Sequence, residues 1–239
     1  MRQTGNSYFR DFSTGSENPI SEKGRWVNGK LSAVDWQNCE VSSGSIHGDT
    51  NGTNSNACMA DINCTDPTCL LTGTWGPDQD ITVVVKNSVP HTHPDSEEAE
   101  CRLRTRFSPH RHVGYELMWS LTNNHYIDLE RWDFDGVNQR FHDLKFIADD
   151  GAVADGDTLR CTMIGTVITG YRNGTQRITY DTSTGNDGGT PGMADSIQYS
   201  TGNPGVGFFL RNFPGSTYVE YGIESAMPGV PPSLPVDVS

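Results

Sequence analysis

The sequence predicts an all-β protein, folded as a two-sheet antiparallel β-sandwich of jelly-roll type. About a dozen segments alternate apolar and polar residues with period two, or form short apolar runs, as strands do. Turn residues are abundant, with 26 Gly and 13 Pro among 239 residues. No segment has the period of an amphipathic helix. Sandwiches of this length are commonly one domain, so we expect a single domain over 1–226 and a Pro-rich tail or linker over 227–239.

The first half of the chain predicts short strands around a long loop. The first strand is expected at 8–12 and an edge strand at 31–41. Gly, Asn, Asp and Thr dominate 42–69, so we expect a long loop there, held by disulfide bonds. The apolar run ITVVV at 81–85 predicts a strand that is buried on both faces. Further ordered segments are expected at 70–75, 100–107, 113–120, 126–132 and 141–148.

The second half predicts a meander. Asn173-Gly174 separates two alternating segments, 167–172 and 175–180. Asn-Gly is the strongest short hairpin signal, because both turn positions need positive φ. A second long polar loop is expected at 181–196. The remaining strands are expected at 158–164, 205–211 and 218–225.

Charge and hydropathy exclude two classes of partner. The formal net charge is -13, whereas binding to nucleic acid phosphates requires a basic surface. The same charge disfavours docking to an anionic membrane. No apolar run approaches the ~20 residues of a membrane span, so membrane insertion is not expected. The first ten residues also lack the apolar segment of a secretion signal.

The cysteines predict three disulfide bonds and an extracellular protein. Their number is even and their spacing matches no Cys-x-x-Cys metal pattern. The connectivity does not follow from the sequence. The residues concerned are Cys39, Cys58, Cys64, Cys69, Cys101 and Cys161. Three N-glycosylation sequons, at Asn51, Asn63 and Asn173, are compatible with secretion, and whether they are occupied is open.

The segment 114–132, GYELMWSLTNNHYIDLERW, predicts the hairpin that carries the functional face. In its first strand Tyr115, Leu117 and Trp119 share one face, and Glu116 lies on the other. In the second strand the apolar residues are opposed by acids and aromatic residues. An outward face with acids and large aromatic side chains indicates a site, because exposed strand faces usually show scattered Thr, Ser and Lys.

Neighbouring strands are expected to complete this face. On the strand at 100–107 the arginines, Arg104 among them, are expected to point outward. On the strand at 141–148 we expect Phe146 to face the core, and Asp143 and Lys145 to point outward. The residues expected to contact carbohydrate are Arg104, Glu116, Tyr126, Asp128, Glu130, Trp132 and Lys145. The competing interpretation is a ladder of solvated ion pairs, each contributing ~0–1 kcal/mol.

The same face offers candidate catalytic residues. Opposed residues on paired strands lie ~5 Å apart and diagonal ones ~7–8 Å. These values span the carboxylate separations of retaining and inverting glycosidases. Glu116, paired with Glu130 or Asp128, is therefore the candidate acid/base pair.

The sequence requires no cofactor, although it allows a structural calcium ion. Asp133 and Asp135 lie in an oxygen-rich segment of the kind that calcium binds. The alternative is ordinary turn chemistry, since Asp and Gly are turn residues. No nucleotide-binding fingerprint or Ser-His-Asp order is present.

Several motifs occur in an order that resembles concanavalin A-like lectin/glucanase domains of bacterial type, a group that includes laminin-G-like modules. The motifs are DFSTGSENPISEKGRWVNG, LLTGTWGPDQ, GYELMWSL with YIDLERW, DTLRCTMIGTVITGYRNGTQ and GNPGVGFFLRN. The resemblance covers about 12–225 and implies the sandwich fold and a polysaccharide ligand. It also implies that Asp11 contributes to a calcium site. In the glucanase-like motif, Tyr126 stands where the nucleophilic glutamate is expected.

Three functions are compatible with these observations. The first is an extracellular polysaccharide-binding module that uses the polar and aromatic sheet face. The second is a glycan-cleaving enzyme, a glycoside hydrolase or polysaccharide lyase, that uses the same face. The third is a structural or adhesive surface protein, in which further domains or self-association provide the contacts.

Overall fold

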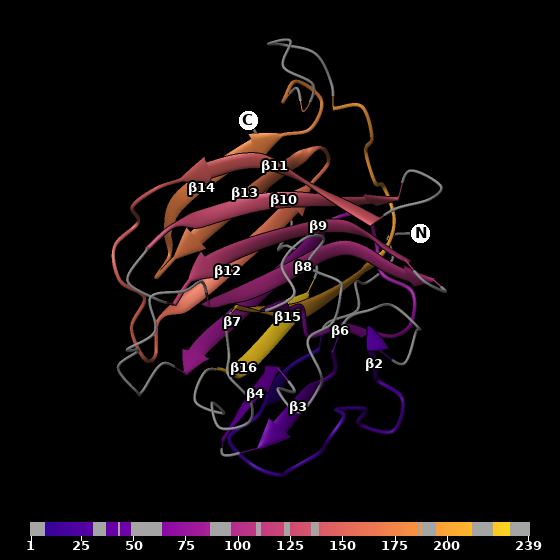
Figure 1. Ribbon diagram of the computed structural model, residues 1–239, viewed down its shortest axis with the longest axis vertical. Coiled ribbons are helices and arrows are strands. Elements are labelled where there is room, and N and C mark those ends of the chain that lie inside the picture. The colour runs from indigo at the N-terminus through magenta and orange to yellow at the C-terminus, as the bar shows by residue number, and fades with distance from the viewer. Residues whose placement is uncertain are drawn as a thin grey trace, which may run out of the picture.

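The structure, a computed structural model, is a sandwich of two antiparallel β-sheets (Figure 1). This confirms the predicted fold class. No α-helix occurs in the part of the chain that the structure describes. The described residues therefore include no helix long and apolar enough to cross a membrane. The described residues are 8–30, 37–42, 44–48, 64–86, 97–108, 111–121, 125–134, 139–185, 187, 195–211 and 222–229.

Among the described residues, the first sheet has eight strands. Their spatial order is β14 (Thr175–Asp181), β13 (Val167–Arg172), β12 (Thr158–Ile164), β7 (Gln79–Lys86), β16 (Gly222–Gly229), β4 (Ser45–Gly48) and β3 (Cys39–Ser42), with β1 (Arg10–Asp11) paired to β16. The strands β12 to β14 form the predicted meander. The pairing of β7 with β16 joins segments far apart in the sequence.

The second sheet also has eight strands in the described part of the chain, and it carries the candidate functional face. Their order is β11 (Gln139–Ile147), β10 (Ile127–Phe134), β9 (Arg111–Ser120), β8 (Glu97–Ser108), β15 (Asn203–Arg211), β6 (Thr68–Leu71) and β2 (Trp26–Asn28), with β5 (Cys64–Thr65) paired to β15. The four long strands β8 to β11 follow one another in the chain and lie side by side in the sheet. Hairpins between consecutive strands therefore build this half of the sheet.

The core lies between the sheets and follows the period-two pattern. On β9, Tyr115, Leu117 and Trp119 are fully buried and face the other sheet. Gly170 of β13 leaves space for them, because a Cβ there would lie 2.4 Å from Leu117 Cδ2 and 3.5 Å from Trp119 Cζ2. The residues of β7 alternate between buried and half-buried positions, so this strand is less deeply buried than ITVVV predicts.

Two boundaries differ from the prediction. The expected loop at 42–69 contains β4, β5 and the start of β6, because short strands at sheet edges need few apolar residues. Its central part lies outside the described residues, as does most of the expected strand at 31–41. The last strand, β16, continues to Gly229, inside the segment expected to be a tail.

The predicted disulfide bonds are not present among the described cysteines. Cys39, Cys69, Cys101 and Cys161 are buried free thiols. Cys39 and Cys69 contact each other through a hydrogen bond between their side chains, and burial raises the pKa of the Cys39 thiol. Cys58 and the side chain of Cys64 lie outside the described part. The three bridges and the extracellular location therefore stay predictions.

The close fit at Gly170 gives a test of the core packing. We expect Gly170→Ala to lower the free energy of unfolding by ~1–3 kcal/mol, because the added methyl group overpacks the contact between the sheets. Gly76→Ala is the matched control, since its Cβ would meet only the carbonyl oxygen of Asp78, at 4.0 Å. Urea denaturation of the two variants measures the difference. Equal stability would contradict the packing described here.

Candidate functional site

Four charged side chains form one row across the outer face of the second sheet. Arg102 lies opposite Glu116, Glu116 opposite Glu130, and Glu130 opposite Asp143. The guanidinium of Arg102 forms ion pairs with Glu116 and Glu100. The row therefore has its positive charge at the β8 end and three carboxylates from β9 to β11.

A β-bulge in β11 decides which residues join this face. The register moves from the pair Leu129 and Lys145 to the pair Glu130 and Asp143, so Leu144 is the extra residue. One extra residue reverses the alternation beyond it. Phe146 consequently points outward and is 54% exposed.

The bulge shows that two expectations for β11 were wrong. Phe146 was expected in the core, and Lys145 was expected beside the acids. Lys145 instead donates a hydrogen bond from Nζ to the carbonyl oxygen of Thr179 at 2.9 Å. Thr179 belongs to β14 of the first sheet, so Lys145 lies on the face opposite to Glu130. Asp143 points outward as expected.

A second bulge, in β8, removes Arg104 from the face. The register moves from Leu103 opposite Tyr115 to Arg106 opposite Val113, and Arg104 has a φ of 47°. Its guanidinium donates hydrogen bonds to the carbonyl oxygens of Pro77, Tyr199 and Gly165, at 2.6, 2.8 and 2.6 Å. The expectation that Arg104 lies beside Glu116 is wrong, and Arg102 occupies that position.

Two pairs of aromatic side chains flank the carboxylates on β10 and β11. The rings of Trp132 and Phe141 are 5.5 Å apart between centroids, and those of Tyr126 and Phe146 are 5.4 Å apart. Trp132 is buried, whereas Phe141 is 42% exposed. Tyr126 is half-buried. The accessible part of the face is therefore its β11 margin, where two aromatic rings and Asp143 are exposed.

Burial changes the electrostatics of the acids between these pairs. Burial, assisted by the charge of Asp143, raises the pKa of Asp128 to about 7. Burial also raises the pKa of Glu130 well above its usual value, and Asp128 and Asp143 add to the effect. Both groups are therefore suited to hold a proton or a cation near neutral pH.

The β8 side of the face is also acidic and closely packed. Burial raises the pKa of Glu100 to about 8, although the charge of Arg102 opposes this shift. Burial and the charge of Glu100 raise the pKa of Glu98 well above its usual value. Gly207 of β15 permits the contact between Arg102 and Glu100, because a Cβ there would lie 2.2 Å from Glu100 Oε2. This half of the face is closed to a ligand.

The two described residues that were expected to bind calcium, Asp11 and Asp133, are not brought together. Asp133 accepts hydrogen bonds from Arg131 Nε and Nη2 and from the hydroxyl of Tyr199. A carboxylate already paired with a guanidinium is a poor ligand for a cation. Asp11 is exposed on β1 of the first sheet and accepts a hydrogen bond from the Ser13 amide. Asp135 lies outside the described residues.

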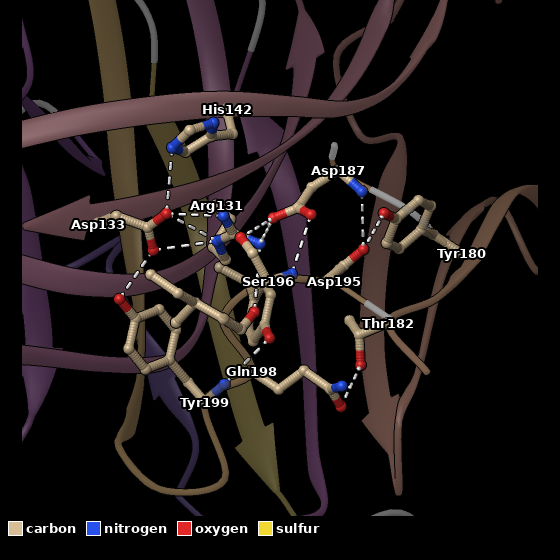
Figure 2. Close-up of polar contacts among 12 residues, drawn as sticks. Arg131, Asp133, His142, Tyr180, Thr182, Asp187, Asp195, Ser196, Gln198 and Tyr199 are labelled. Carbon is tan, nitrogen blue, oxygen red and sulfur yellow. Dashed lines mark hydrogen bonds and ion pairs between the residues drawn. The ribbon is translucent and has the colours of Figure 1, made fainter. Parts of the chain in front are cut away.

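The sequence analysis missed the cluster around Arg131, which Figure 2 shows. Arg131 is fully buried and pairs with Asp133 at 2.7 Å and with Asp187 at 2.5 Å. Burial alone would raise the pKa of Asp187, but hydrogen bonds from Ser196 and the charge of Arg131 lower it. The hydroxyl of Tyr180 donates to Asp195. The cluster fixes described residues of the 181–199 connection against β10.

Comparisons with known proteins support the fold. No protein-family model matches the sequence, and no curated protein matches it. A solved structure described as a native glycosidic hydrolase has a TM-score of 0.50 at 12% identity, over 97% of this chain and 99% of that one. An endo-β-galactosidase from Clostridium perfringens that releases GlcNAcα1-4Gal has a TM-score of 0.51 at 8% identity, over 96% of this chain and 64% of that one.

These similarities concern the fold alone. A carbohydrate-binding module from Bacillus subtilis has a TM-score of 0.48 at 9% identity, over 86% of this chain and 92% of that one. The two structures at the higher TM-scores support the concanavalin A-like sandwich that the sequence motifs resemble. The bacterial type of the resemblance stays a prediction.

Proposed function

We propose that the chain is a glycan-binding module that contacts its ligand at the β11 margin of the outer face. The observation that carries this proposal is the pair of exposed rings, Phe141 and Phe146, on either side of the accessible carboxylate of Asp143. Aromatic rings provide rigid apolar surfaces for the C–H faces of sugar rings, and a carboxylate accepts hydrogen bonds from hydroxyl groups.

The buried residues of the face support the exposed ones. Trp132 packs against Phe141 and against the ring of His112, whose centroid is 4.5 Å away. Tyr126 packs against Phe146. These contacts with neighbouring aromatic rings on the same face fix the orientations of Phe141 and Phe146. Rings that are already fixed lose less conformational entropy when a ligand binds. In this proposal Glu116 and Arg102 position the sheet face and do not contact the ligand.

The proposal includes an extracellular polysaccharide as the ligand. Its support is the even number of cysteines and the contact between Cys39 and Cys69, which would allow a bridge in an oxidising compartment. Burial raises the pKa of the Cys39 thiol and so keeps that thiol protonated and unreactive in the reduced protein. Self-association or further domains would add contacts but are not needed for this face to bind a glycan.

Truncation of one exposed ring tests the binding proposal. We expect Phe146→Ala to weaken binding to a glycan selected on a polysaccharide array by about tenfold, a loss of ~1.4 kcal/mol. Phe9→Ala is the matched control, because Phe9 is a 63% exposed phenylalanine next to β1, away from this face. Titration calorimetry measures both. Equal affinities for the two variants, or no glycan bound by the parent protein, would contradict the proposal.

Glycan cleavage is the second candidate, and the direct opposition of Glu116 and Glu130 favours it. If the face is catalytic, the parent protein should release reducing ends or unsaturated products from the bound glycan. Glu130→Gln should then lower the rate by about 10²-fold or more, the usual loss for a general acid or base. A parent protein that binds the glycan and releases no product would leave binding as the function.

A further inference from the structure

Three carboxylates converge on the outer face of β10 and β11. Asp128, Glu130 and Asp143 each place one oxygen within 4.8 Å of the oxygens of the other two. The bulge at Leu144 creates this arrangement, because it brings Asp143 opposite Glu130. Without the extra residue, Leu144 would occupy that position.

One buried oxygen of this group has no hydrogen-bond partner among the described residues. Asp128 is 9% exposed, and its carboxylate accepts a hydrogen bond from the Leu129 amide, but its Oδ1 atom has no such partner in the described part of the chain. Buried carboxylate oxygens are nearly always hydrogen-bonded, and a buried charge is costly unless it is paired or binds a metal. The Asp128 carboxylate belongs to the converging group, so an ion between the three side chains would supply the partner that Oδ1 lacks among the described residues.

The nearest cationic side chains in the described part of the chain have other partners. Arg102 is paired with Glu100 and Glu116 at the β8 side of the row. Lys145 donates to Thr179 on the opposite face. Arg131 is paired with Asp133 and Asp187. None of these three balances the charge of Asp128, Glu130 and Asp143.

We propose that Asp128, Glu130 and Asp143 bind a divalent cation of the calcium class. The three donors are all carboxylate oxygens, which hard cations prefer, and no nitrogen or sulfur donor belongs to the group. Calcium–oxygen bonds are ~2.3–2.6 Å long, so two ligands of one calcium ion lie at most about 5.2 Å apart, and the three oxygens meet this condition. Asp143 is exposed, so water completes the coordination shell.

This site differs from the calcium site expected from the sequence, which used Asp11, Asp133 and Asp135. Asp143 takes part in both proposals, but the cation site does not rest on the glycan proposal, because the aromatic rings that would contact a sugar are not cation ligands. The alternative for the same group is that the carboxyls hold protons in place of a cation. That alternative predicts no saturable cation binding, so the two are separable by experiment.

Cation binding to the full chain is the direct test. After removal of metals with a chelator, we expect saturable calcium binding in titration calorimetry. We also expect terbium luminescence sensitised by Trp132, which neighbours Glu130 on this face. Calcium at about a hundredfold above its Kd should raise the Tm by roughly 5–10 °C. Magnesium should bind more weakly, because it demands closer octahedral ligands.

Two substitutions locate the ion. Asp143→Asn should weaken calcium binding by at least about tenfold. The same change should raise the Tm of the metal-free protein, since it removes repulsion between carboxylates. Because Asp143 is exposed, this variant is expected to fold. Asp149→Asn is the matched control: it removes the same charge, and the new side chain keeps the acceptor for the Gly151 amide.

The outcomes decide the proposal in either direction. Binding by the parent and by Asp149→Asn, with loss in Asp143→Asn, supports the site. Absence of saturable binding in the parent overturns it, as does equal affinity in Asp143→Asn and Asp149→Asn. Phe146→Ala should bind calcium as the parent does. If that variant loses glycan and keeps calcium, the two proposals stand or fall separately.

Discussion

The arrangement of the functional face depends on two β-bulges in the second sheet. In a regular strand, side chains alternate strictly between the two faces, so one extra residue transfers every later side chain to the other face. The bulge in β11 brings Phe146 and Asp143 to the outer face and sends Lys145 toward the first sheet. The bulge in β8 leaves Arg102 outside and directs Arg104 across the end of the sandwich.

These bulges divide the charges of the molecule into separate groups. On the outer face, Arg102 forms ion pairs with Glu100 and Glu116 at the β8 end and none with the carboxylates at the β11 end. Burial of like charges then raises the pKa of Asp128 and Glu130, which favours proton or cation binding. On the inner side, Arg131 pairs with Asp133 and Asp187, and these ion pairs hold described residues of the 181–199 connection against β10.

Period-two alternation predicted much of this fold from the sequence. It located β9 and β10 and their faces, because the register between these strands is continuous from Ile127 to Trp132. The bulges could not be predicted in the same way. The extra residue in β11 is an apolar leucine, which fits any core-facing position. In β8 it is Arg104, at positive φ without a glycine to mark the turn. Arg131 was missed because its partner Asp187 lies 56 residues away in a loop, and no local pattern pairs them.

The register between β10 and β11 is the central claim, and cross-strand nuclear Overhauser effects measure it directly in this 26.2 kDa chain. The structure predicts contacts between the backbone protons of three cross-strand pairs. These pairs are Leu129 with Lys145, Glu130 with Asp143, and Trp132 with Phe141. A regular ladder would instead pair Glu130 with Leu144 and Trp132 with His142. Observation of that second pattern would contradict the arrangement of the face and remove the basis for both proposed binding sites.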